Sequence, residues 1–302
     1  MSERRSQPSA GETDTATVVE AAPAKINLYL HVLGRRPDGY HEIDSLVAFA
    51  DCGDRVTASP AIDATLAIEG PFAHDCPQAS ANLVMRAAIM LAAATARPMM
   101  AALLLDKQLP VAAGIGGGSA DAAAALRALQ RLWRTDLDGP LLAGMGLSLG
   151  ADVPVCLDGR PARVRGIGER VETVPVLPAA GLLLVNPGVP LATAEVFAAR
   201  QGAFGVPAPA LPSRFADARA LANWLGPCRN DLTDAAIACR PVVRSVLTAL
   251  ETAPACLLAR MSGSGATCFG LFADRAAAES AARSVAGERP NWWVCASALK
   301  TD

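Results

Sequence analysis

A glycine-rich segment that runs into an alanine-rich one constrains this chain more than any other feature. It reads LPVAAGIGGGSADAAAALRAL and spans residues 109–129. The glycines at positions 114, 116, 117 and 118 let the backbone turn tightly and approach a ligand closely. The alanines predict a helix that begins near Ser119. Because the start of a helix presents unpaired N–H groups and the positive end of its dipole, the segment predicts a binding site for a polyphosphate.

This loop matches neither of the two common nucleotide-binding patterns. The sequence lacks the Gly-Lys-Ser/Thr of the P-loop, and Ser119 stands where the dinucleotide fingerprint has its third glycine. It also lacks the companion motifs of protein kinases. Taken alone, the segment has a less favoured alternative, a tight structural turn before a helix.

A strand with a polar face is predicted earlier in the chain, at Ala24 to His31. Apolar residues alternate with polar ones there, which is the pattern of a half-buried strand. Lys25 and Asn27 then project from one face, roughly 7 Å apart. The alternative for Lys25 is a solvated charge on an exposed strand face, as is usual for lysine.

The remaining pattern mixes short strands with helices and favours an α+β fold. Strands are predicted near Val47 to Phe49 and at 103–105, 182–185 and 267–272, and helices at 82–96, 121–133, 140–149, 234–250 and 273–286. Gly150 would end the helix predicted at 140–149 and place Asp152 on the turn that follows. A helix cap or turn residue is one interpretation of Asp152, and a catalytic residue is the other. We predict a disordered tail at 1–18, a first domain at 19–165 and a second at 166–302, with the lobe boundary between Gly159 and Gly181.

Length, charge and composition narrow the class of partner. The 302 residues suffice for two lobes, and 29 acidic against 27 basic residues, with no dense basic block, give no footprint for nucleic acid. The longest uncharged run, 173–194, is interrupted by prolines, and the N-terminus resembles no signal peptide, so we expect no membrane segment and a cytoplasmic location. Eight cysteines without CxxC and three histidines without HExxH predict no dedicated metal site. A small-molecule substrate is therefore expected, while the oligomeric state is not indicated.

Several separated blocks carry a family resemblance. They are PAKINLYL at 23–30, DGYH at 38–41, the glycine loop, GADVPV at 150–155 and MSGSGATCFGLF at 261–272. In this order they resemble the GHMP superfamily of small-molecule kinases, from about Val19 onward. The resemblance implies a two-lobed α+β fold with mixed and antiparallel sheets, and an active site in the cleft between the lobes. For the block at 261–272, a tight connection under the sheet is the alternative to a part in the site.

The resemblance also implies roles for individual residues. It makes Lys25 and Asp152 catalytic and places Asn27, Tyr40 and His41 on the substrate. Its ATP loop falls on Pro110, Val111, Ala112, Ala113, Gly114, Ile115, Gly116, Gly117, Gly118, Ser119 and Ala120. Mg²⁺ is expected to arrive with ATP and to lie near Ser119. Many members carry serine and asparagine where this chain has Ala120 and Asp121, which puts any role for the side chain at 120 in doubt. Asn82 matches a position near the adenine, to which we assign no role.

The implied activity is transfer of the γ-phosphoryl group of ATP to an alcohol. Asp152 would accept or orient the hydroxyl proton, and Lys25 would keep Asp152 ionised and offset developing charge. Kinases of the same superfamily that act on mevalonate, homoserine or a sugar are one alternative. The DGYH block argues against them, because a cytidine-bearing substrate gives Tyr40 and His41 a base to bind. A nucleotide-binding module without catalysis is the other alternative, and the presence of both Lys25 and Asp152 argues against it.

Overall fold

The computed structural model describes residues 17–301, so the predicted tail at 1–18 lies outside the described residues except for its last two. The strands are β1 (Val18–Arg35), β2 (His41–Pro60), β3 (Thr65–Glu69), β4 (Ala101–Asp106), β5 (Ala162–Gly166), β6 (Arg170–Thr173), β7 (Gly181–Asn186), β8 (Leu258–Met261), β9 (Cys268–Phe272) and β10 (Trp293–Ala298). The helices are α1 (Leu83–Ala94), α2 (Gly117–Trp133), α3 (Gly139–Leu149), α4 (Val153–Asp158), α5 (Thr193–Ala199), α6 (Ala218–Leu225), α7 (Thr233–Cys239), α8 (Val242–Glu251) and α9 (Arg275–Glu288).

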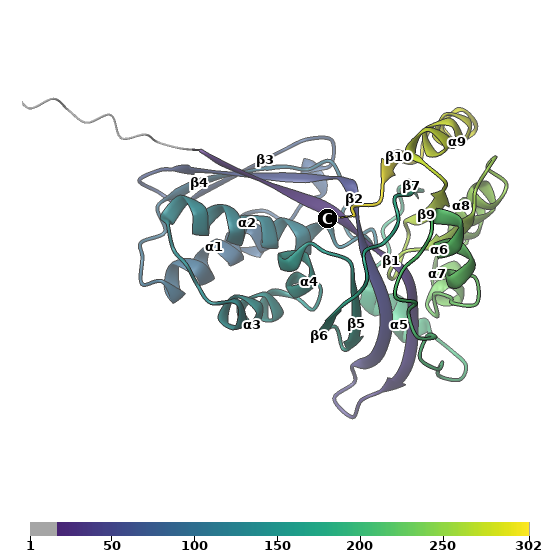
Figure 1. The fold of residues 1–302 in the computed structure, drawn as a ribbon. Helices are drawn as coiled ribbons and strands as arrows, with labels where there is room; N and C mark the ends of the chain where they lie inside the picture. Colours follow the sequence, from purple (N-terminus) through teal and green to yellow (C-terminus); the bar gives the residue numbers. More distant parts are fainter. Residues whose placement is uncertain (1–16, 302) are drawn as a thin grey trace, which may run out of the picture.

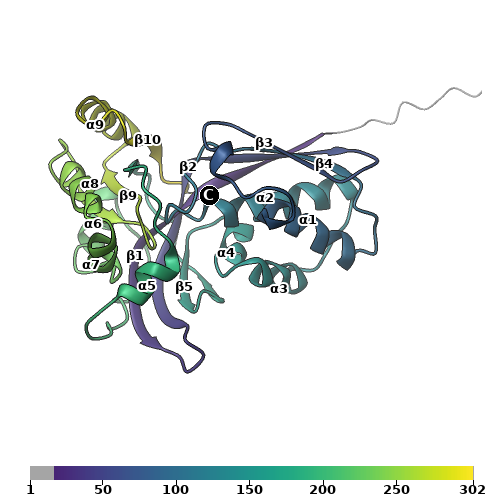
Figure 2. The ribbon, with the colours of Figure 1, turned by 180° about the vertical axis from the view of Figure 1, so that it is seen from behind.

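Two sheets divide the molecule into two lobes (Figures 1 and 2). The first has the strand order β3-β4-β2-β5-β6, with β1 paired to β2. Strand β2 pairs with β5 through residues 43–47 and with β4 through 55–60, while β1 runs along its other edge. Only β3 and β4 pair in parallel in this sheet. The second sheet, β10-β7-β9-β8, is antiparallel throughout. The predicted α+β class with mixed and antiparallel sheets is confirmed.

Separate apolar cores support the lobes, and a third cluster joins them. Helices α1 to α4 lie on one side of the first sheet (Figure 1), where Leu91 and Leu126 are buried together with Leu105 of β4. A second cluster packs helices α7, α8 and α9 against the second sheet. In the third cluster, Ile26 of β1 is buried with Phe269 of β9. The β1–β2 ribbon is therefore common to both lobes, and its residues lie between the two sheets.

Strand β1 differs from the half-buried strand that its alternation predicts. It extends over 18 residues, and every residue from Ala24 to Val32 is buried, including Lys25 and Asn27 at 3% exposure each. The apolar residues Ile26 and Leu28 face the cluster between the lobes, as the period of two requires. The other face is covered by segments distant in sequence, which the alternation alone does not reveal.

Two predicted helices also differ in detail. The helix predicted at 234–250 is wrong as one element, because α7 ends before Arg240 and α8 begins at Val242. Arg240 is extended, with φ −140° and ψ 90°, because the following Pro241 disfavours helical backbone in the residue before it. Helix α2 begins at Gly117, two residues earlier than predicted. The other predicted strands and helices are present, with ends shifted by a few residues.

The chain passes from the first sheet to the second after β6. Because β5 pairs with β6 in a hairpin, residues up to Thr173 belong to the first sheet. The second sheet begins at Gly181, and segment 174–180 connects the two. The domain boundary at 165/166 stays a prediction. Between residues 17 and 301 there is no helix with the length and apolar character needed to cross a bilayer.

Candidate active site

The glycine loop between β4 and α2 forms a cradle of backbone groups. Gly114 and Gly116 have φ values of 73° and 61°, in the left-handed region that favours glycine. A Cβ on Gly116 would lie 3.0 Å from the Cβ of Lys25, so a side chain at 116 would push against β1. Because α2 begins at Gly117, the first N–H groups of that helix have no partner within it. The loop therefore has the geometry that its sequence predicts for a phosphate site.

A second glycine turn, at 262–265 between β8 and β9, supports this loop. The hydroxyl of Ser262 donates to the carbonyl oxygen of Gly114 over 2.9 Å and accepts from the backbone N–H of Asn27 over 3.1 Å. A Cβ on Gly114 would lie 2.5 Å from the carbonyl oxygen of Ser262. The block at 261–272 therefore does more than connect two strands, because it holds the glycine loop in place.

Lys25 and Asp152 come together although 127 residues separate them in sequence. The Lys25 ammonium donates to Oδ2 of Asp152 and to Oδ1 of Asn27, each over 2.9 Å. The Asn27 amide nitrogen in turn donates to the hydroxyl of Ser45 over 2.8 Å, which fixes the carbonyl oxygen toward Lys25. The Lys25 side chain is 4% exposed, so it is not the solvated charge of the alternative interpretation.

Asp152 stands at the start of α4 but does not cap it. Its side chain accepts no capping hydrogen bond from that helix, and it is 41% exposed. One carboxylate oxygen is bound to Lys25, while the exposed part of the side chain faces the adjoining cavity. The capping alternative therefore has no hydrogen bond to support it.

A cavity of about 1250 Å³ lies between the lobes and contains the pair and the loop. Nearly all of the predicted site residues line it: Lys25, Asn27, Tyr40, His41, Pro110, Val111, Ala112, Ala113, Gly114, Gly116, Gly117, Gly118, Ser119 and Asp152. Ile115 and Ala120 are exceptions, because their side chains are buried in the cores at 1% exposure each. Ile115 takes part through its backbone, since its carbonyl oxygen accepts from the N–H of Lys25 over 3.0 Å.

One end of this cavity is built by the DGYH block and by α5. The His41 ring stacks on Phe197, with ring centroids 4.9 Å apart and an angle of 27° between the planes. Tyr40 beside it is 61% exposed. Burial, followed by the positive charges of Arg35 and Arg200, lowers the pKa of His41, which favours the neutral imidazole. Phe197 and Arg200 were not predicted from the sequence, because no local pattern shows that α5 faces the DGYH block.

Beneath the glycine loop lies a buried cluster that no local pattern in the sequence predicts. The Lys107 ammonium contacts Oδ2 of both Asp54 and Asp121, the latter at 2.8 Å. The other oxygen of Asp54 accepts from the N–H groups of Gln108 and Leu109, at 2.7 and 2.8 Å, which anchors the start of the loop. Burial raises the pKa of Asp121 to about 8, against the opposing effect of Lys107. Asp54 also has the two backbone donors, which Asp121 lacks, so the cluster favours ionisation of Asp54 over ionisation of Asp121. The residue that departs from the family pattern thus has a structural role here.

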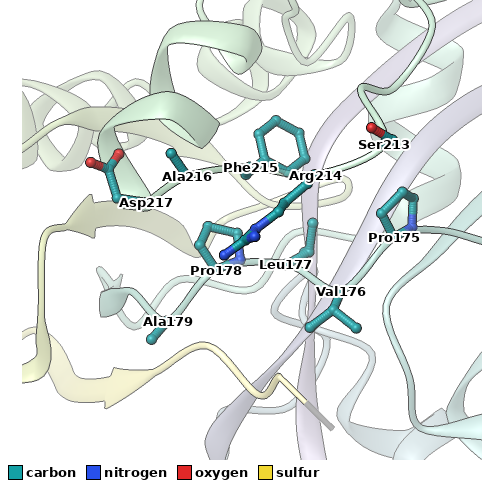
Figure 3. Close-up of a pocket in the computed structure, with 10 residues that line it drawn as sticks. All are labelled: Pro175, Val176, Leu177, Pro178, Ala179, Ser213, Arg214, Phe215, Ala216 and Asp217. Carbon is teal, nitrogen blue, oxygen red and sulfur yellow. The ribbon is translucent and has the colours of Figure 1, made fainter.

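A smaller pocket of about 630 Å³ lies away from these groups (Figure 3). Segments 175–179 and 213–217 line it, and Figure 3 shows Arg214 extending across it toward Pro178. Its acidic residue, Asp217, accepts from the N–H of Ala220 over 2.8 Å and so caps α6. This pocket shares no lining residue with the large cavity, and no predicted site residue lies in it.

Comparison with known proteins identifies the family. The model for the GHMP kinases N terminal domain matches residues 82–160, and that for the GHMP kinases C terminal matches residues 208–290. Together the two models cover more than half of the chain, which therefore belongs to the GHMP kinase family.

Close relatives place the chain more narrowly within this family. A protein of Paramagnetospirillum magneticum is 53% identical over 92% of this chain and 97% of its own length. One of Rhodospirillum rubrum is 49% identical over 95% of this chain and 94% of its own. Both are named 4-diphosphocytidyl-2-C-methyl-D-erythritol kinase.

Solved structures agree with this placement. A crystal structure of 4-(cytidine 5'-diphospho)-2C-methyl-D-erythritol kinase is 34% identical, with a TM-score of 0.78 over 94% of this chain and all of that one. A homoserine kinase from Cytophaga hutchinsonii has a TM-score of 0.69 at 18% identity over 97% of each chain, which shows the shared fold alone.

Proposed function

We propose that this protein transfers the γ-phosphoryl group of ATP to the 2-hydroxyl of 4-diphosphocytidyl-2-C-methyl-D-erythritol. The products are ADP and the 2-phosphate, in the non-mevalonate route to isopentenyl diphosphate. The observation that carries the proposal is the Lys25–Asp152 pair, closed at 2.9 Å in the same cavity as the glycine loop. The names of the relatives supply the acceptor.

On the nucleotide side, the backbone of the loop provides the binding groups. The N–H groups at the start of α2, with the positive end of the helix dipole, are suited to the phosphates of ATP. Mg²⁺ bound with the nucleotide would neutralise phosphate charge. Oxygen ligands suit this ion, and Ser119 supplies a side-chain hydroxyl in the part of the loop that lines the cavity.

On the acceptor side, Asp152 accepts the proton of the substrate hydroxyl. As the hydroxyl oxygen bonds to the γ-phosphorus, the bond from that phosphorus to the β,γ-bridging oxygen breaks, and ADP carries away the electron pair. The ammonium of Lys25 balances the negative charge that develops beside Asp152. Asn27 lines the cavity and also holds Lys25 in position through its carbonyl oxygen.

The cytosine of the substrate is proposed to bind at the end of the cavity built by the DGYH block. Tyr40 offers an aromatic face, and the neutral imidazole of His41 has one donor and one acceptor nitrogen. Stacking against Phe197 fixes the plane of His41. A mevalonate, homoserine or sugar kinase has no base to place there, so these alternatives are less favoured. The cytoplasm stays our predicted location, and a small molecule without nucleic acid stays our predicted partner.

The test is ADP release from ATP and Mg²⁺ across a panel of alcohols. The panel contains 4-diphosphocytidyl-2-C-methyl-D-erythritol, mevalonate, homoserine and galactose. We expect turnover with the cytidyl compound, at a kcat/KM at least a hundredfold above the rest. Comparable rates with another alcohol would reassign the substrate, and no turnover with any of them would favour a nucleotide-binding module.

A further inference from the structure

Two arginines line the large cavity without an acidic partner among residues 17–301. Arg35 ends β1, and Arg200 follows α5 directly. Their hydrogen bonds within residues 17–301 go to backbone carbonyl oxygens: Arg35 donates to Gly39 over 3.4 Å, and Arg200 donates to Gly202 and Ala203. The Nε of Arg200 is buried and has no hydrogen-bond partner in this part of the chain. Both guanidinium groups therefore keep uncompensated charge and free donor capacity.

Both arginines lie at the end of the cavity that the DGYH block and α5 build. Arg35 donates to Gly39 within the DGYH block, and Arg200 stands three residues after Phe197, whose ring stacks on His41. The two lysines that line the cavity differ, because Lys25 is paired with Asp152 and Lys107 with Asp54 and Asp121. Positive charge is therefore unbalanced at the two arginines near His41 and balanced at Lys25 and Lys107.

We propose that Arg35 and Arg200 bind the diphosphate group of the acceptor substrate and so select cytidine diphosphate esters over uncharged alcohols. The identity of that substrate rests on the proposed function. A substrate with its base at Tyr40 and His41 and its hydroxyl at Asp152 must place the connecting diphosphate along the wall between them. Arg35 and Arg200 adjoin the base-binding end of that wall. Guanidinium groups match phosphate oxygens in charge and in donor geometry, and they make short, charge-assisted hydrogen bonds.

The two arginines differ in the number of contacts that their side chains make with the protein. Arg200 holds the turn at 200–204 through its carbonyl contacts, and its guanidinium lies 4.8 Å from the centroid of Phe204. Its replacement therefore changes packing as well as charge. Arg35 is exposed and makes one long hydrogen bond, so Arg35→Gln removes charge with little other change. The Arg35 variant keeps the proposal testable if Arg200→Gln fails to fold.

The experiment measures binding of cytidine, CMP and CDP to the full chain by titration calorimetry. We expect the wild-type protein to bind CDP more tightly than cytidine. Arg35→Gln and Arg200→Gln should each weaken CDP binding roughly tenfold, while cytidine affinity changes less than about twofold. Arg283→Gln on α9 removes the same charge outside the cavity and should change neither affinity. Raising the salt concentration should shrink the preference for CDP, since exposed charges are screened.

Three outcomes would overturn the proposal. In the first, wild-type protein binds CDP no better than cytidine. In the second, CDP affinity is unchanged in both variants, so neither arginine contacts phosphate. In the third, cytidine and CDP affinities fall equally in Arg35→Gln, which assigns the residue to folding of the hairpin. A failure of the proposed function is detected by a different measurement. In that case, the wild-type protein releases no ADP from ATP with the cytidyl substrate.

Discussion

Replacement of Asp152 by asparagine tests the centre of the proposed reaction. Asparagine keeps the size of the side chain and an oxygen for the Lys25 ammonium, which lies 2.9 Å from Oδ2, but it removes the charge that accepts a proton. We expect kcat to fall by roughly 10²–10⁴, the usual contribution of a placed general base. This corresponds to about 2.7–5.4 kcal/mol of transition-state stabilisation. ATP affinity should change little, because the loop amides are untouched.

A double-mutant cycle with Lys25→Ala shows whether the two residues act as one unit. The structure gives the Lys25 ammonium two hydrogen-bond partners, Asp152 and Asn27, so its removal takes the same pair apart. If each single variant loses about 10³ in kcat, independent residues would lose about 10⁶ together. A single unit would lose about 10³ in the double variant as well, which is a coupling free energy of about 4 kcal/mol.

The assay is steady-state ADP release at saturating ATP and acceptor, with a nucleotide titration on every variant to verify folding. Asp158→Asn is the matched control, because Asp158 lies on the same helix, pairs with Arg160 and is outside the cavity. It should keep wild-type turnover. Near-normal turnover of folded Asp152→Asn, or losses that multiply in the double variant, would refute the reasoning.

Further predictions concern the loop, a buried ion pair and the base site. Gly114→Ala should cost about 2–4 kcal/mol in the free energy of unfolding by urea. Position 114 has a φ of 73°, and a Cβ there would lie 2.5 Å from the Ser262 carbonyl oxygen. Gly139→Ala is the control, because a Cβ at 139 would have nothing within 4 Å. Asp44→Ala should cost about 3–5 kcal/mol, because it leaves Arg163 buried without its carboxylate partner. Burial opposes ionisation of Asp44, but its hydrogen bonds to Arg163 and to the N–H of Ala208 lower its pKa overall. The ionised carboxylate therefore stabilises the fold above about pH 4. The difference in the free energy of unfolding by urea between wild type and Asp44→Asn should shrink as the pH falls below that value. His41→Ala should raise the KM for the cytidyl substrate by about one to two decades and leave the KM for ATP unchanged, and equal effects on both would assign DGYH to structure.

Several features were predictable from the sequence because their causes are local. The glycines at 114 and at 116 to 118, with the alanines that follow, favour a tight turn and a helix start through local backbone preferences. The family was predictable for another reason, since several separated blocks in the right order are far more specific than one. Pro241 also carried a local signal for a helix end, but the prediction of a single helix at 234–250 did not use it.

The sequence alone determined the α+β class, the glycine loop before a helix and the family, because backbone conformation and motif identity are read over a few adjacent residues. Only the tertiary structure decided the contacts that make a site from these parts. Lys25 meets Asp152 across 127 residues, and Ser262 contacts both Asn27, 235 residues away, and Gly114, 148 residues away. The burial of Lys107 between two aspartates, and the approach of Phe197 and Arg200 to His41, likewise depend on how the lobes pack. The burial of a charged group and the shift of its pKa depend on its neighbours in space, so both are decided only when the chain has folded.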